Sequence, residues 1–181
     1  MGIALPLSHL GLLLLLSTSF NYADHWNLVS ADDNIIQLQC NNVDVPSTCI
    51  QCVKSDPRSQ SANKAGIAAI VITCLSNKVG MLSSNMSALA SAMHDKKAKS
   101  VLQSCEKCFS VATTHLGNAT SMLEAKEYDG TNEMVVAALG REVDCKQNAK
   151  AYNVTVPYGV VYDMRVYLEL SDAVLRIIDR F

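Results

Sequence analysis

Between residues 65 and 93, apolar side chains recur at alternating gaps of three and four residues. This spacing places them on one face of an α-helix, because each helical turn takes about 3.6 residues. Polar residues such as Asn77, Lys78 and Ser84 occupy positions between them. The pattern therefore predicts a long amphipathic helix with one buried stripe. The stripe consists of Ala65, Ala68, Ile72, Leu75, Val79, Leu82, Met86, Leu89 and Met93.

Three more helices are predicted after this one. The polar cluster at residues 94–97 predicts a turn, and a second apolar stripe runs from Ala98 to Leu123. Turn chemistry at residues 126–130 separates it from a third helix beginning near residue 131, whose stripe is interrupted by Glu142. After the break around Pro157, a fourth helix is predicted from Val160 to Ile178.

Four long helices joined by short turns predict an all-α, antiparallel four-helix bundle, because short connections make neighbouring helices run in opposite directions. The absence of proline from residues 58–156 agrees with this prediction. Residues 31–62 are polar and contain Pro46 and Pro57. We expect them to form short helices packed outside the bundle, as an N-terminal arm.

The N-terminus predicts export from the cell. Residues 1–23 contain no Asp, Glu, Lys or Arg, and the apolar run Leu10–Leu16 is too short to cross a bilayer. We interpret residues 1–23 as a signal peptide. Glycosylation sequons at Asn85, Asn118 and Asn153 agree with a secreted protein.

The charge balance removes two classes of partner. Fifteen basic and 17 acidic residues give a formal net charge of −2. Such a chain has no excess positive charge with which to bind a phosphate backbone or an anionic membrane. We therefore expect neither nucleic acid nor a membrane among its partners.

The chain has seven cysteines, so at least one thiol is left over or pairs between chains. If the second and third bundle helices turn back near residue 127, Cys105 and Cys145 lie nearly level and can be bridged. Cys40 and Cys49 flank a short polar loop and can also be bridged. Cys74 lies at the edge of the first apolar stripe, where we interpret it as a small buried hydrophobe.

No sequence motif for catalysis is present, neither a nucleophile elbow, nor a phosphate loop, nor a zinc-protease helix. His25, His94 and His115 have no motif partner that would orient them as bases. These absences favour a binding protein that is not an enzyme and uses no cofactor or metal. A zinc or redox protein is the alternative, using the pairs Cys49/Cys52 and Cys105/Cys108.

An ordered set of segments resembles the plant invertase and pectin methylesterase inhibitor family over residues 33–181. The segments are Cys40, Pro46-Ser47-Thr48-Cys49, residues 54–59, the helix with Cys105 and Phe109, and Ala137-Ala138-Leu139 before Cys145. Residues 126–132 and the final helix, 168–178, are similar to the pollen-allergen-like subgroup of invertase inhibitors. The resemblance implies a helical hairpin before the bundle, bridges Cys40–Cys49 and Cys105–Cys145, and secretion to the apoplast or cell wall. It also implies non-covalent occlusion of a cell-wall enzyme's active-site cleft.

Two features depart from the family pattern. Invertase inhibitors carry Pro-Lys-Phe near the turn before the third bundle helix, where this chain has Tyr128-Asp129-Gly130. An aspartate there would repel the paired carboxylates of a glycosidase. The extra Cys52 and Cys108 can form a third bridge if they lie close together, which would leave Cys74 free.

The sequence therefore predicts a secreted inhibitor of pectin methylesterase rather than of acid invertase, with Tyr128, Asp129 and Gly130 as candidate contacts with the enzyme. A secreted bundle that binds or signals without inhibiting an enzyme is the alternative, ahead of the zinc or redox protein.

Overall fold

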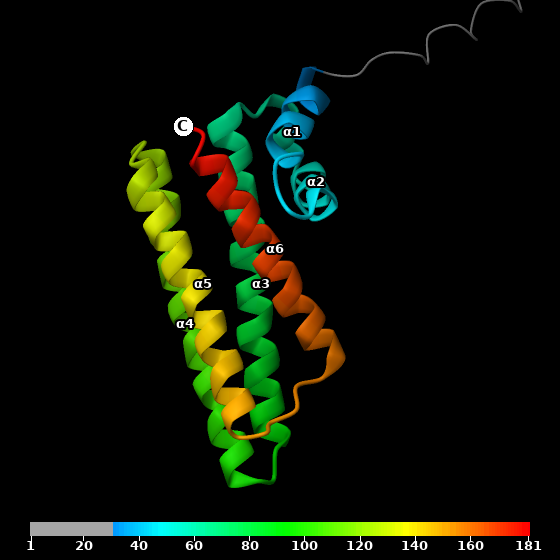
Figure 1. Cartoon of the computed structure of the whole chain (residues 1–181), viewed down its shortest axis with the longest axis vertical. Helices are drawn as coiled ribbons and strands as arrows, with labels where there is room; N and C mark the ends of the chain where they lie inside the picture. The colour runs from blue at the N-terminus through cyan, green and yellow to red at the C-terminus, as the bar shows by residue number, and fades with distance from the viewer. Residues whose placement is uncertain (1–30) are drawn as a thin grey trace, which may run out of the picture. The chain divides into compact units, whose positions relative to one another are not determined.

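A computed structural model describes residues 31–181, which form six α-helices and one 3₁₀ segment (Figure 1). The predicted signal peptide, residues 1–23, lies outside the described residues. Two short helices come first, followed by four long ones. The elements are α1 Ala31–Cys40, α2 Pro46–Ser55, η1 Pro57–Ser61, α3 Lys64–Ala92, α4 Lys96–Glu124, α5 Tyr128–Ala151 and α6 Tyr158–Ile178.

The four long helices form the predicted antiparallel bundle. α4 packs against both α3 and α5, and α6 packs against α3 and α5 to close the bundle (Figure 1). Side chains just before two of the helices set where they begin. Asn63 Oδ1 accepts a hydrogen bond from Gly66 N at 2.9 Å, and Asp95 Oδ1 accepts one from Ala98 N at 2.7 Å. These caps satisfy backbone donors that have no partner within the helix.

The predicted apolar stripes form the core. Leu75, Val79, Leu82 and Met86 of α3 are fully buried, as is Phe109 of α4. α3 is also long and apolar enough, by length and composition alone, to cross a membrane. Within the described chain, the apolar face of α3 packs against the other helices of the bundle.

The N-terminal hairpin, α1 and α2, is fastened to α6 by polar contacts. Arg176 Nη2 lies 2.6 Å from Asp44 Oδ1, and Thr48 Oγ1 donates a hydrogen bond to Glu169 Oε2 at 2.5 Å. Near the C-terminus, the guanidinium of Arg180 donates to the backbone carbonyl and the side chain of Gln39 at 2.9 and 2.8 Å. These contacts hold the hairpin against the end of the bundle where α6 finishes.

Three disulfides cross-link the described chain. Cys40–Cys49 closes the hairpin, and Cys105–Cys145 joins α4 to α5 inside the core. Both pairings are those expected from the sequence. The third bond, Cys52–Cys74, joins α2 to α3.

The Cys52–Cys74 bond corrects two sequence interpretations. Cys52 does not pair with Cys108, which is the free cysteine, and Cys74 is not a simple buried hydrophobe. The reason is the position of α2, which packs against α3 and brings Cys52 to the edge of the apolar stripe of α3, where Cys74 lies. Because three of the four cysteines in the two Cys-x-x-Cys pairs are bridged, these pairs do not form the alternative zinc or dithiol site.

Thiol titration tests this arrangement. All seven cysteines lie in the described chain and six are bridged, so the denatured, unreduced protein should contain one thiol per chain. The same titration on a Cys108→Ser variant should find none. Three thiols in the unmodified protein would mean that one of the three bonds is open.

Candidate functional site

The turn between α4 and α5 has the hydrogen-bond pattern of a Schellman motif. Glu127 N donates to Met122 O at 2.8 Å, and Lys126 N donates to Leu123 O at 3.0 Å. Lys126 has a φ of 62°, in the left-handed region that glycine usually occupies at this position. The exposed lysine therefore sits at the apex of the turn in a strained backbone conformation, a feature often found at functional sites.

The residues predicted to form this turn lie directly after it in the sequence. Tyr128, Asp129 and Gly130 form the first turn of α5, not the connection itself. The helix was predicted to begin near residue 131 because Asp-Gly is typical of a turn, but it begins at Tyr128. Asp129 instead stabilises the helix N-terminus, where a negative charge is favourable. A Cβ at Gly130 would lie 2.9 Å from Met122 Sδ, so the glycine allows α4 and α5 to approach closely.

The C-terminal residue completes this end of the bundle. The Phe181 ring stacks on Tyr128, with 4.3 Å between centroids and 14° between planes, and Lys64 Nζ lies 4.2 Å from the Phe181 centroid. Lys64 Nζ also donates a hydrogen bond to the backbone carbonyl of Arg180. Burial lowers the pKa of Lys64, and the positive charge of Arg180 lowers it further. Asn132 Nδ2 donates to Asp179 Oδ1 at 2.5 Å and joins α5 to the end of α6.

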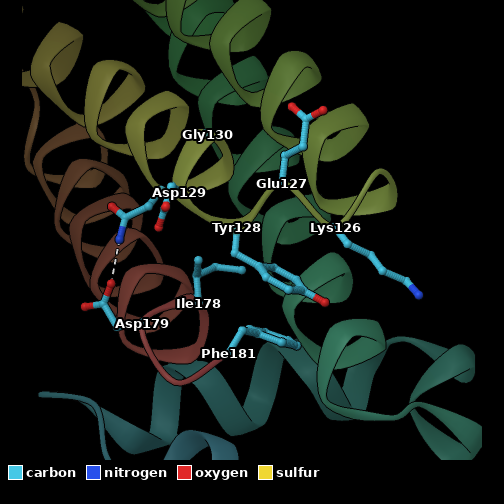
Figure 2. A pocket seen from close by; sticks show the side chains of 9 residues that line it. Lys126, Glu127, Tyr128, Asp129, Gly130, Ile178, Asp179 and Phe181 are labelled. Atoms are coloured by element: carbon cyan, nitrogen blue, oxygen red, sulfur yellow. Dashed lines mark hydrogen bonds between the residues drawn. The ribbon is translucent and has the colours of Figure 1, made fainter.

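The α4–α5 turn, the start of α5 and the last residues of the chain surround an open hollow of about 650 Å³, shown in Figure 2. Its lining carries one cation, Lys126, and three carboxylates. In Figure 2, Lys126 points away from the stacked rings of Tyr128 and Phe181, and Asp129 lies on the other side of them. The lining therefore carries an excess of negative charge. The carboxylates belong to Glu127, Asp129 and Asp179.

The ionisable side chains of the hollow are its three carboxylates, Tyr128 and Lys126. No cysteine, histidine or serine lines it. His94 is exposed and His115 half-buried elsewhere on the bundle. Within residues 31–181, no three His, Cys, Asp or Glu side chains gather closely enough to hold a metal ion. The site is a charged, concave surface formed by the ends of three helices, α4, α5 and α6.

The predicted glycosylation sites are spread over three elements. Asn85 is half-buried on α3, Asn118 is exposed on α4, and Asn153 is exposed just after α5. Asn153 has a φ of 53° and ends α5 in the way that Lys126 ends α4. Glycosylation at these positions stays a prediction.

Comparison with known proteins identifies the family. The model of the family described as plant invertase/pectin methylesterase inhibitor matches residues 34–177. The chain belongs to this family. The family is one of enzyme inhibitors, and curated relatives carry both kinds of inhibitor name.

Two relatives of the inhibitor family illustrate its two branches. The cell wall / vacuolar inhibitor of fructosidase 2 of Arabidopsis thaliana is 30% identical over 138 residues, covering 72% of this chain and 73% of that protein. A pectinesterase inhibitor of Actinidia deliciosa is 27% identical over 120 residues, covering 66% and 65% of the two chains. These relatives therefore support membership of the family but do not assign the chain to either branch.

Solved structures of inhibitor-family members share the fold. A mutant form of a pectin methylesterase inhibitor from Arabidopsis superposes with a TM-score of 0.68 at 21% identity, covering 80% of this chain and 95% of that one. A pectin methylesterase inhibitor from Arabidopsis thaliana gives 0.61 at 20% identity, with coverages of 81% and 95%. At this level of identity the likeness shows the helical fold alone.

Sequence reasoning found part of this site. It singled out Tyr128, Asp129 and Gly130, which do line the hollow, but it missed Lys126 and Phe181. Only tertiary structure brings Phe181 onto Tyr128, because 53 residues separate them in the sequence. A turn was predicted over residues 126–130, but nothing in the local sequence marked Lys126 as its left-handed residue, since that position is usually glycine.

Proposed function

We propose that the chain is a secreted inhibitor of pectin methylesterase that binds over the enzyme's active-site cleft without covalent chemistry. Family membership supports inhibition as the activity. The choice of target is supported by one observation, the excess of carboxylates around the α4–α5 turn. Glycosidases of the invertase kind work with paired carboxylates, and a surface rich in carboxylates is repelled by them.

Inhibition of acid invertase is the second candidate. The observation in its favour is Lys126, an exposed cation at the apex of the turn, three residues before Asp129. A lysine presented there could approach acidic residues of a glycosidase if Glu127 and Asp129 were directed away from the contact. The fructosidase inhibitor among the relatives agrees with this candidate.

Titration of both enzymes with the purified protein separates the candidates. We expect pectin methylesterase to be inhibited at an equimolar ratio and acid invertase to stay active. Inhibition of invertase alone, lost in a Lys126→Ala variant, would establish the second candidate instead. Activity of both enzymes at large molar excess of the protein would support the non-inhibitory alternative and overturn the proposal.

An Asp129→Lys variant tests the charge argument directly. It removes a carboxylate at the hollow and adds a cation, so it should acquire inhibition of acid invertase, with affinity improved by about ten-fold or more. The measurement is the inhibition constant against invertase. The matched control is Glu106→Lys, which makes the same charge change 18 residues, or about 27 Å, back along α4 from its last residue. Equal gains in the two variants would show that net charge, and not this turn, decides the target.

A further inference from the structure

Four of the six exposed lysines that have no acidic partner in the described chain lie at one end of the bundle. Within the described chain, most other basic side chains are paired, as Lys78 is with Asp163 and Arg141 with Asp144. Six exposed lysines make no ion pair, and all but Lys126 lie on α4 or at the end of α5. The six are Lys96, Lys97, Lys99, Lys107, Lys126 and Lys150.

Three of these lysines occupy the position in α4 where positive charge is least favourable. Lys96, Lys97 and Lys99 lie in the first turn, which contains no acidic residue; the one carboxylate at this helix start is that of the N-cap residue, Asp95. The N-terminus of a helix carries a partial positive charge, so helix stability favours aspartate or glutamate there. Lys150, in the last turn of α5, obeys the same rule. The first turn of α4 breaks it three times, and such local violations are expected where a surface serves a function.

The fold brings the two lysine-bearing ends together. α4 and α5 run antiparallel and are joined by Cys105–Cys145, and Asn148 Nδ2 lies 3.5 Å from Ser104 Oγ. Closer to the end, Lys97 Nζ lies 5.8 Å from the centroid of the Tyr152 ring. The first turn of α4 is therefore beside the last turn of α5, at the end of the bundle that also holds the α3–α4 turn (Figure 1).

The row of exposed lysines continues along α4. Lys96, Lys99 and Lys107 fall within one helical stripe, and their span of 11 residues corresponds to about 16 Å. Tyr152 is 55% exposed, so its ring is available at the edge of the lysines. A row of separated cations beside an accessible aromatic ring suits an extended polymer that carries regularly spaced single negative charges and flat ring faces.

We propose that the basic end, defined as Lys96, Lys97, Lys99, Lys150 and Tyr152, binds de-esterified pectin. This choice of polymer rests on the proposed function, because hydrolysis of methyl esters by pectin methylesterase leaves one carboxylate on each sugar. The carboxylates would pair with the lysines and a sugar ring would lie against Tyr152. The basic end lies at the opposite end of α4 from the hollow at Lys126, so one molecule can use both surfaces.

Binding of polygalacturonate, measured by titration calorimetry at low salt, tests the proposal. The full secreted protein should bind polygalacturonate and leave highly methyl-esterified pectin unbound, and added salt should weaken the binding by screening. A Lys97→Gln/Lys99→Gln variant should bind about ten-fold more weakly or worse. The matched control, Lys54→Gln/Arg58→Gln, loses the same charge on α2 and η1, away from the basic end, and should bind within about two-fold of the unmodified protein.

Several results would overturn the proposal. One is that polygalacturonate binding weakens equally in the two variants. Another is that esterified pectin binds as tightly as polygalacturonate. A third is binding of anionic phospholipid vesicles without binding of polygalacturonate. The measurement is made before and after enzymatic removal of glycans, because Asn153 adjoins Tyr152; absence of binding in both forms is also contrary to the proposal. No enzyme is present in this assay, so its failure is distinct from a failure to inhibit pectin methylesterase, which the enzyme titration reports.

Discussion

Replacing Cys105 and Cys145 together by alanine should lower the free energy of unfolding by about 4 kcal/mol. The bond closes a loop of 40 residues, and its loss releases that much chain entropy in the unfolded state. Both cysteines are fully buried between α4 and α5, so the variant also loses packing at the centre of the bundle. Small domains have about 5–15 kcal/mol of stability in total, so this loss removes a large fraction of it.

Urea denaturation followed by circular dichroism measures this change. The control variant is Cys108→Ala, which removes a half-buried thiol from α4 without opening a bond and should cost less than about 1 kcal/mol. A second comparison is Cys40→Ala/Cys49→Ala, whose shorter loop predicts about 2.5 kcal/mol. If the Cys105/Cys145 variant were no less stable than Cys108→Ala, the bond would not support the bundle as argued.

The second large effect concerns Glu142, whose side chain is only 1% exposed in the core. Lys146 Nζ lies 2.9 Å from Glu142 Oε1, but neither carboxylate oxygen has a hydrogen bond of good geometry. Burial raises the pKa of Glu142 above its ordinary value of 4.5, and Lys146 opposes part of this shift. On α6, the hydroxyl of buried Tyr167 is also without a partner, and its pKa is raised by burial and by the charge of Glu142.

The raised pKa fixes the sign of the pH effect. Between the unfolded and folded pKa values, the folded chain binds more protons than the unfolded chain, so stability falls as pH rises. The contribution of Glu142 is fully present below about pH 4.5 and is lost as pH rises through the folded pKa. In a Glu142→Gln variant the side chain at position 142 is uncharged in both acid and neutral solution. At neutral pH this variant should be more stable than the unmodified protein by about 1–3 kcal/mol.

The quantity to measure is the difference in unfolding free energy between variant and unmodified protein, taken at several pH values. This difference should be small in acid and grow in favour of Glu142→Gln toward neutral pH. Glu133→Gln, an exposed position on the same helix, should show no such trend. A pH-independent difference for Glu142→Gln would mean that the buried carboxylate keeps its ordinary pKa.

Periodic patterns in the sequence were sufficient to predict the bundle. The stripes of α3 and α4 are long, and neither helix contains proline, so their existence followed from the spacing of apolar residues and their antiparallel directions from the short turn between them. Glu142 interrupted the stripe of α5 and weakened its prediction, yet the structure buries it with the apolar residues on either side. Charge and burial conflict at this residue, and a hydropathy pattern alone cannot decide such a conflict.

The third disulfide and the candidate site were less predictable, because both depend on contacts between residues that are distant in sequence. The position of α2 across α3 determines that Cys52 reaches Cys74, and nothing in the local sequence of either helix specifies that crossing. Likewise, Phe181 reaches Tyr128 only because α6 returns to the end of the bundle where α5 begins. By contrast, Tyr128, Asp129 and Gly130 could be selected because helix boundaries carry local signals in their residue types.

α4 contains 29 residues, and at 1.5 Å per residue its axis is about 44 Å long. Its first turn carries three lysines, and its last residues lead into the acidic hollow. The helix thus acts as a rigid spacer of fixed length between two oppositely charged surfaces. If a first partner binds one of these surfaces, the other surface is held at a fixed distance from that partner. The effective concentration of the protein at a second partner would then depend on the distance between the two partners.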